Sequence, residues 1–276
     1  MNDIFIRKDK KMNTELTIKE TQEAAFVVLK KLKEIFDRNN WKYYLAYGTL
    51  LGAIRHNGFI PWDDDIDIWV PRKDYELFIK YCIEHEQDLK PFELFHYKLK
   101  KNYVYTIGRF SDSRYKTDYE NVKDYGLGVF VDIYPLDGMN PNDFHICKKI
   151  NKVKREIAIC GTIKIPRKNK IKYLLKLPYA LVVKKKNLNK LLKLNDNLAQ
   201  KYDFESCNNF CCMAWDSKQF PYKKEWLGNC THIFNGELFR IPENYDEILK
   251  KLYGDYMKFP PKEERVGHHY YKVYKR

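Results

Sequence analysis

Residues 47–68 read YGTLLGAIRHNGFIPWDDDIDI, and this stretch allows the fold to be predicted. A short aromatic strand, predicted for residues 43–47, ends at Gly48 and Thr49, where a short helix begins. A second strand, predicted for residues 63–70, carries several aspartates. Free amide hydrogens and a hydroxyl at a helix start can bind phosphate. The stretch therefore predicts a phosphate-binding turn beside an acidic strand.

The acidic strand places like charges close together. Side chains alternate along a strand, so Asp63, Asp65 and Asp67 are predicted to share one face and Asp64 to lie on the other. Each neighbouring pair of carboxylates costs about 1 kcal/mol even in water. Oxygen ligands suit Mg²⁺, Mn²⁺ or Ca²⁺. We therefore expect a divalent cation at Asp65 and Asp67, with Mg²⁺ first and Mn²⁺ as the alternative.

A further carboxylate, Asp132, lies in the apolar segment VFVDI of residues 129–133, where an unpaired buried charge would be costly. A shared metal explains this position, so Asp65, Asp67 and Asp132 are the predicted catalytic and metal-binding residues. In the alternative, residues 63–67 form an exposed acidic turn and Asp132 pairs with an arginine such as Arg109.

The rest of the chain predicts an α+β protein. Thr17 and Glu20 have capping-box spacing at the start of a helix predicted for residues 14–39. A helix is predicted from Asp74, as its N-cap, to Glu86, and another near residues 245–253. Further strands are predicted at residues 103–110 and 127–134, and a helical, basic region at 142–201 broken near Pro166 and Pro178.

Length and composition suit one catalytic unit with an appended segment. The chain has 276 residues, of which 44% are hydrophobic. We predict a catalytic core at residues 1–141, the basic helical segment at 142–201, and a C-terminal α/β part at 202–276 that packs on the core. Charges interrupt the first twelve residues, and no stretch of about 18 apolar residues occurs. These features favour a cytoplasmic protein.

The seven cysteines are odd in number and scattered, which favours reduced thiols. Zinc is the alternative for one group of them, although its spacing lacks paired CxxC motifs. That group consists of Cys207, Cys211, Cys212, Cys230 and His232.

The formal net charge of +14 is local. Residues 148–190 contain fifteen lysines and arginines against one acid, Glu156, whereas the rest of the chain is balanced. Within residues 171–186, apolar clusters alternate with lysines, which fits peripheral contact with an anionic membrane, such as the inner face of the cell membrane. The alternative is a solvated helix that packs through its apolar side.

Three segments resemble the LicD phosphotransferase family: residues 47–68, residues 131–137 (VDIYPLD), and residues 252–257 (LYGDYM) with Pro260 and Pro261 following. The basic region after Lys148 is matched least. The resemblance implies a nucleotidyltransferase-type mixed sheet flanked by helices. It also implies that Gly48 and Thr49 precede the metal-binding Asp65 and Asp67, with Asp132 as the third carboxylate.

Family members transfer phosphocholine, or other phospho-alcohols such as ribitol phosphate, from a CDP-linked donor. The acceptor implied is a lipid-linked sugar of a teichoic acid, lipopolysaccharide or capsule precursor. Thr49 and nearby amides would orient the donor phosphates, and Arg55, His56 and Arg109 are candidate phosphate or acceptor contacts. Trp62 is a candidate choline contact through cation–π attraction. From the C-terminal part, Arg265 and His268 are candidates that reach back to the site.

Two alternatives remain from the residues alone. A nucleotidyltransferase acting on RNA, a small molecule or a protein would share the fold and the metal site. The chain shows no recognisable RNA-binding motif, so we expect no nucleic-acid partner. A non-enzymatic basic adaptor would leave the acidic strand and Asp132 unexplained.

Overall fold

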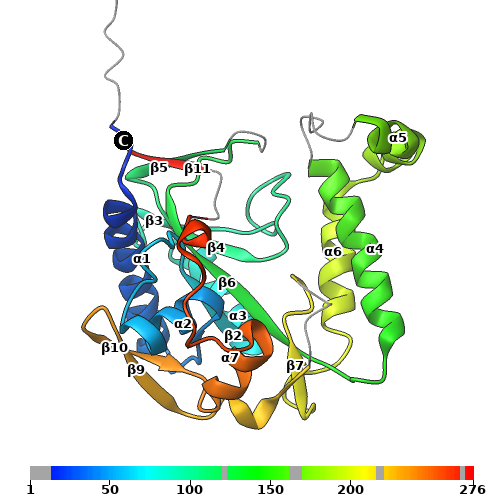
Figure 1. Ribbon diagram of the computed structural model, residues 1–276. Coiled ribbons are helices and arrows are strands. Elements are labelled where there is room, and N and C mark those ends of the chain that lie inside the picture. The colour runs from blue at the N-terminus through cyan, green and yellow to red at the C-terminus, as the bar shows by residue number, and fades with distance from the viewer. Residues whose placement is uncertain (1–13, 120–122, 162–169, 216–220, 268–270) are drawn as a thin grey trace, which may run out of the picture.

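The computed structural model describes residues 14–119, 123–161, 170–215, 221–267 and 271–276. These residues form a mixed α+β structure in which helices pack around a curled sheet, as predicted (Figure 1). The helices are α1 (Ile18–Arg38), α2 (Tyr47–His56), α3 (Arg72–Glu84), α4 (Phe144–Gly161), α5 (Lys170–Lys184), α6 (Leu188–Ala199) and α7 (Tyr245–Tyr253), with short 3₁₀ turns at Lys224–Trp226 and Lys262–Glu264. The strands are β1 (Tyr44–Leu45), β2 (Asp67–Pro71), β3 (Phe92–Phe95), β4 (Gly108–Asp112), β5 (Tyr115–Tyr119), β6 (Val129–Gly138), β7 (Asn209–Cys211), β8 (Tyr222–Lys223), β9 (Cys230–Phe234), β10 (Glu237–Ile241) and β11 (Tyr271–Lys275).

The central sheet has the order β1-β2-β6-β4-β3. Strands β2 and β6 run parallel, and the other pairs are antiparallel. All residues of β2, β4 and β6 are buried, so these three strands form the centre of the core. Two strands from later in the chain, β7 and β8, extend the sheet from the end of β6. The last strand, β11, pairs with β5.

Helix α1 begins where the sequence predicts. The Thr17 hydroxyl accepts from the Glu20 amide, and the Glu20 carboxylate accepts from the Thr17 amide, which completes the capping box. Its buried face, which includes Val28, Leu32 and Ile35, packs against β4 and β6.

Several predicted boundaries were wrong. The acidic strand begins at Asp67 rather than at residue 63. Helix α3 begins at Arg72 after Pro71, because Asp74 uses its carboxylate to accept from the Lys42 amide instead of capping the helix. Helix α5 continues through Pro178, whereas Pro166 lies outside the described residues.

The helical segment, which we define as α4, α5 and α6, lies beside the sheet (Figure 1). Helices α4 and α6 pack together through Val153, Ile157, Leu191 and Leu192. A buried ion network joins the segment to the core, because Arg72 at the start of α3 contacts both Asp137 of β6 and Asp196 of α6. Among the described residues, no helix is both long enough and apolar enough to cross a membrane.

Candidate active site

Two buried carboxylates face each other across the parallel strands. Asp67 is the first residue of β2, and its Cα is the register partner of Asp132 in β6. Both residues are nearly covered, with exposed fractions of 6% and 7%. The Asp132 amide donates to the Ile66 carbonyl at 2.9 Å, and the Asp67 amide donates to the Thr49 hydroxyl at 2.9 Å. Hydrogen bonds from their own backbone amides therefore fix the positions of both aspartates.

The Asp67 carboxylate is in an unfavourable environment for a charge. Burial, and then the charges of Asp65, Asp132 and Asp63, raise its pKa well above the usual range. A hydrogen bond with the Tyr134 side chain opposes this shift in pKa. The Oδ1 atom of Asp67 is buried and has no hydrogen-bond partner among the described residues. A buried carboxylate oxygen in this position is costly unless a proton or a cation neutralises its charge.

Asp132 is already paired. The Nε of Arg109 donates to Asp132 Oδ1 at 2.7 Å, and the Arg109 guanidinium lies over the rings of Tyr105 and Phe130, 3.9 and 4.5 Å from their centroids. The ion pair of Asp132 with Arg109, which was one half of the alternative reading, is thus present. The other half, an exposed acidic turn, does not hold at Asp67, which is buried. Within the described ranges, no three His, Cys, Asp or Glu side chains gather closely enough to hold a metal ion as they stand.

Asp63 does not belong to the strand, contrary to the prediction. Its carboxylate lies against the first turn of α2, where a Cβ at position 48 would come within 2.7 Å of Asp63 Oδ2. Gln22 of α1 donates to the carbonyls of Ile60 and Asp63 and holds this turn in place. A larger residue at position 48 would displace the Asp63 carboxylate from this place. The sheet ladder begins only at Asp67.

Thr49 lies deeper than a phosphate-binding hydroxyl would. It is buried, and its hydroxyl accepts from the Asp67 amide. It therefore connects α2 to the start of β2, and its predicted role with phosphate stays a prediction. Tyr134, which contacts Asp67, was missed. Because Asp132 and Tyr134 are two residues apart on one strand, alternation alone could have placed them on the same face.

A pocket of about 440 Å³ opens beside these carboxylates. One wall comes from α2 and the turn after it, including Gly48, Arg55 and Trp62, and the other comes from residues 253–261. The two walls are joined by Arg55, whose Nη1 donates to the Tyr256 carbonyl at 2.9 Å. The pocket adjoins the carboxylates, because Asp63 and Tyr253 both line it. Burial, and then the charges of Asp67, Asp63 and Asp65, raise the pKa of Tyr253, so this tyrosine lies near all three acids.

Two guanidinium groups meet at this pocket. The centroid of the Phe259 ring lies 4.8 Å from the Arg55 guanidinium and 5.3 Å from the Arg265 guanidinium. The Arg265 guanidinium also lies 5.6 Å from the centroid of the Trp62 ring. Burial, and then the charge of Arg265, lower the pKa of Arg55. His56 accepts from Arg55 Nε, and burial followed by the Arg55 charge lowers its pKa as well. The structure therefore brings Arg265 to the same place as Arg55, His56 and Trp62, whereas His268 lies outside the described residues.

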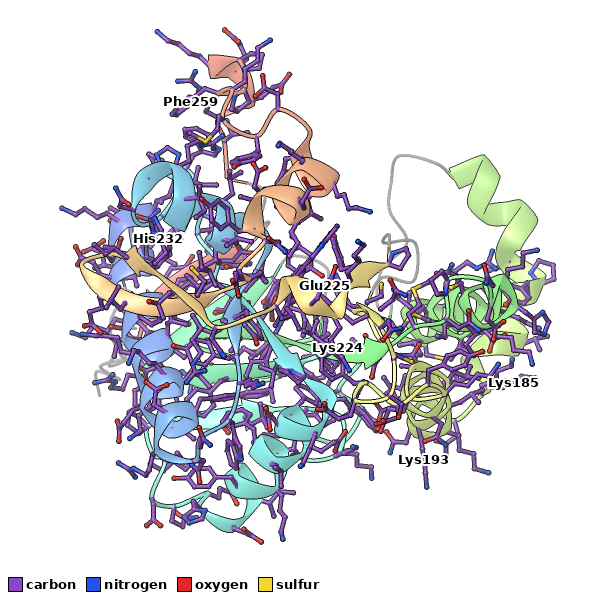
Figure 2. The ribbon with its side chains drawn as sticks, turned by 90° about the horizontal axis from the view of Figure 1, so that it is seen from below. Lys185, Lys193, Lys224, Glu225, His232 and Phe259 are labelled. Carbon is purple, nitrogen blue, oxygen red and sulfur yellow. The ribbon has the colours of Figure 1, made fainter. Side chains whose placement is uncertain are left out.

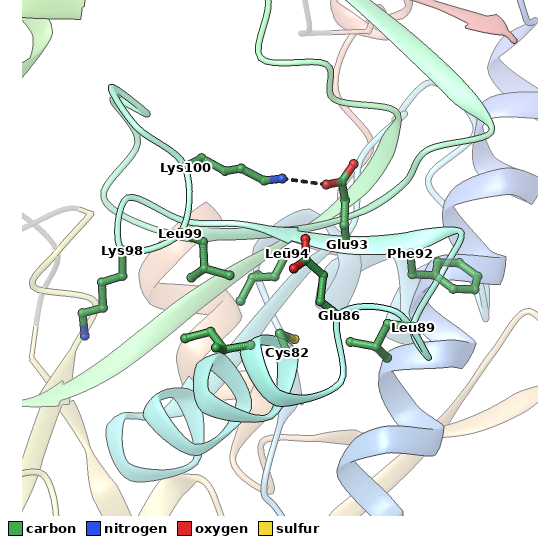
Figure 3. Close-up of a pocket in the computed structure, with 10 residues that line it drawn as sticks. Cys82, Glu86, Leu89, Phe92, Glu93, Leu94, Lys98, Leu99 and Lys100 are labelled. Carbon is green, nitrogen blue, oxygen red and sulfur yellow. Dashed lines mark hydrogen bonds and ion pairs between the residues drawn. The ribbon is translucent and has the colours of Figure 1, made fainter.

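Two other candidate regions lie apart from this site. A pocket of about 280 Å³ lies between α3 and β3, where Lys100 pairs with Glu93 and Cys82 lies at the side of α3 (Figure 3). Burial raises the pKa of the Cys82 thiol, which makes it a poor nucleophile. The candidate zinc ligands are divided between β7, which holds Cys211, and the β9–β10 hairpin, which holds Cys230 and His232 (Figure 2).

Comparison with known proteins relates this chain to one sequence family. A sequence profile described as the LicD/FKTN/FKRP nucleotidyltransferase domain matches residues 40–158, which include Asp67 and Asp132. The lipopolysaccharide cholinephosphotransferase LicD of Haemophilus influenzae is 30% identical over 94% of this chain and 98% of its own length. An uncharacterized protein of Rickettsia typhi is 34% identical over 46% of this chain and 38% of its own. Another, from Rickettsia prowazekii, is 38% identical over 30% of this chain and 29% of its own.

Proposed function

Because this chain belongs to the LicD family, we propose that it transfers phosphocholine, or a related phospho-alcohol, from a CDP-linked donor to a sugar hydroxyl. The acceptor would be a precursor of lipopolysaccharide, teichoic acid or capsule. The observation that carries this proposal is the similarity to a cholinephosphotransferase over nearly the full length of both chains. The buried pair of Asp67 and Asp132 beside a pocket gives that similarity a chemical basis.

The carboxylates suit a hard divalent cation by their chemistry, although no three acids of the described residues gather closely enough to hold one as they stand. Asp67 has a buried oxygen with no partner among the described residues, and the neighbouring charges of Asp65 and Asp63 raise its pKa. Oxygen ligands of this kind suit Mg²⁺, with Mn²⁺ as the alternative. We expect Asp65 and Asp67 to hold the ion, and Asp132 to contribute while sharing its charge with Arg109. When bound, the cation would supply positive charge at the donor pyrophosphate.

In such a transfer the protein mainly positions the reactants and stabilises charge, and it need form no covalent bond with the transferred group. The acceptor oxygen attacks the phosphorus of the phosphocholine group, the bond between that phosphorus and the CMP oxygen breaks, and the hydroxyl proton passes to a carboxylate of the cluster. CMP leaves with the bonding electron pair. Arg55 and Arg265 are suited to bind a phosphate, because two guanidinium groups held near one ring repel each other until an anion lies between them.

The pocket also suits the cationic end of a zwitterion. Its lining includes the acids Asp63 and Asp255 and the rings of Tyr253 and Tyr256. Carboxylates and aromatic faces together attract a quaternary ammonium group. A pocket that contains both acids and arginines therefore fits phosphocholine better than it fits a uniformly anionic phospho-alcohol.

The test is transfer of choline-labelled phosphocholine from CDP-choline to a glycan-lipid extract, with CMP release measured in parallel. We expect activity with Mg²⁺ and none with a chelator. Asp67→Asn and Asp132→Asn should each lower turnover on the order of 10²- to 10³-fold, the usual effect of removing a group that stabilises transition-state charge. Asp88→Asn, at an exposed carboxylate in the turn after α3, is the matched control.

The second candidate function is nucleotidyl transfer, which the nucleotidyltransferase domain of the family profile favours. The same assay with α-labelled CTP or ATP separates the two reactions. Label from the nucleotide in the product would replace our proposal with nucleotidyl transfer, and wild-type turnover in Asp67→Asn would remove the carboxylate pair from either mechanism.

A further inference from the structure

Helix α5 lies at a corner of the molecule, at one end of α4 and α6 (Figure 1). Its C-terminal half packs on α4 through Ala180 and Val183, both buried, and the Cys160 thiol donates to the Val183 carbonyl. The opposite face of this half contains Leu181 and Val182, which are 56% and 63% exposed. At about 100° per residue, Leu181, Val182 and Lys185 lie on one stripe, turned away from the packed face. The stripe is exposed although these helical turns are well packed, because Ala180 and Val183 on their other side are buried.

The charge around this stripe has one sign. Helix α5 contains no acidic residue, and Lys184, Lys185 and Lys186 follow the apolar positions directly. Glu156 of α4 contacts this end of α5: it is buried and accepts from Lys186 at 2.7 Å and from the Tyr179 hydroxyl at 3.3 Å. Figure 2 shows Lys185 and Lys193 at the periphery of the helical segment. The surface thus presents lysines around exposed aliphatic side chains, and the Glu156 carboxylate beside them is already paired with Lys186.

We propose that the exposed face of α5, made of Leu181, Val182 and Lys185, binds the surface of an anionic lipid bilayer. Lysines attract an anionic leaflet, and aliphatic side chains at the centre of the patch enter the headgroup region. A second copy of this chain is a poor occupant, because two such basic faces repel each other. Nucleic acid would satisfy the lysines but would leave Leu181 and Val182 without an apolar partner.

This contact goes beyond the proposed reaction and does not depend on the identity of the donor. It supplies a physical reason for a lipid-linked acceptor, because a protein held at the bilayer meets such a substrate in two dimensions. The buried contact of Arg72 with Asp196 connects this helical segment to the strands that carry the carboxylates. Membrane contact through α5 would thus fix the orientation of the catalytic sheet at the bilayer.

The test is sedimentation of the full-length protein with vesicles, which requires no activity. We expect binding to vesicles that contain phosphatidylglycerol, little binding to phosphatidylcholine alone, and loss of binding between about 0.1 and 1 M salt, as the Debye length falls from ~10 to ~3 Å. Lys185→Gln should lower the partition coefficient about fivefold, the usual effect of one basic residue near an anionic surface. Leu181→Ser/Val182→Ser should lower it on the order of tenfold.

The matched control is Ile233→Ser/Leu238→Ser in the β9–β10 hairpin, where two aliphatic register partners are 48% and 57% exposed. This variant should bind vesicles as the wild type does. Both α5 variants change exposed side chains, and an unchanged melting temperature would verify that they fold. Equal binding to neutral vesicles, unaltered binding by both α5 variants, or equal loss in the control would each overturn the proposal. So would displacement of the vesicles by an equal mass of single-stranded RNA.

Discussion

Replacing Arg72 by methionine should destabilise the protein strongly. The Arg72 guanidinium donates to both carboxylate oxygens of Asp137, at 2.7 and 2.9 Å, and to Asp196 at 2.9 Å. The side chains of Arg72 and Asp137 are 10% and 1% exposed. Without Arg72, the Asp137 charge would be buried with no cation beside it. Breaking a buried ion pair from one side costs about 3–5 kcal/mol, so we expect a loss of that size in the free energy of unfolding at pH 7.

The pH dependence of this loss identifies its cause. Burial already raises the pKa of Asp137 despite the opposing charge of Arg72, so removal of Arg72 should raise that pKa further above the unfolded value. A raised carboxyl pKa means that the folded protein binds the proton more readily than the unfolded chain. The destabilisation of Arg72→Met should therefore be largest at neutral pH and decrease as the pH falls through the raised pKa.

Urea unfolding followed by circular dichroism, at pH 7 and at pH 5, measures both effects. Arg72→Lys keeps the charge and should lose less, and the double variant Arg72→Met/Asp137→Asn should lose less than the sum of its single variants. A loss below about 1 kcal/mol, or an equal loss at the two pH values, would refute the reasoning from a buried charge.

Three further predictions concern single positions. Asp67→Asn should raise the melting temperature in the presence of a chelator, because burial and then neighbouring acids raise the pKa of Asp67 and make its charge unfavourable. In the same thermal-shift assay, Mg²⁺ should stabilise only the wild type. Burial, then the charge of Lys98, lowers the pKa of His96 to about 3, so below about pH 6.5 the unfolded chain binds a proton that the folded protein does not. Wild-type stability should accordingly fall by up to about 1.4 kcal/mol per pH unit from pH 6.5 downward, and urea titrations of His96→Asn should show a flatter profile. Thr49→Val leaves the Asp67 amide without its acceptor and should cost about 1–3 kcal/mol in urea unfolding, whereas Thr49→Ser should lose much less.

The sequence predicts the pairing of the two carboxylates because the signal is local. An aspartate between buried aliphatic residues of one strand must face something polar, and an Asp-x-Asp pair on a neighbouring strand supplies it. The observed register of Asp67 with Asp132 agrees with that argument. The capping box of α1 was predictable for the same reason, because both of its partners lie within four residues of sequence.

Contacts between distant segments could not be predicted. Gln22 of α1 holds the turn that precedes the strand, and this contact leaves no pattern in the acidic stretch itself. Arg72 contacts Asp137 and Asp196, which follow it in the sequence by 65 and 124 positions. No periodicity reveals contacts over such distances. The expected stop at Pro178 failed because packing of α5 on α4 outweighs the missing amide of one proline.

The two-walled construction of the pocket has a consequence for biosynthesis. Arg55 reaches its partner carbonyl on Tyr256 only after 201 further residues have been added, which at about 5–20 residues per second takes roughly 10–40 s of translation. Until then, a nascent chain would carry its acidic turn without the opposite wall of the pocket. A half-made polypeptide could thus not enclose a ligand between the two walls, and the pocket would form only when the C-terminal part has been synthesised.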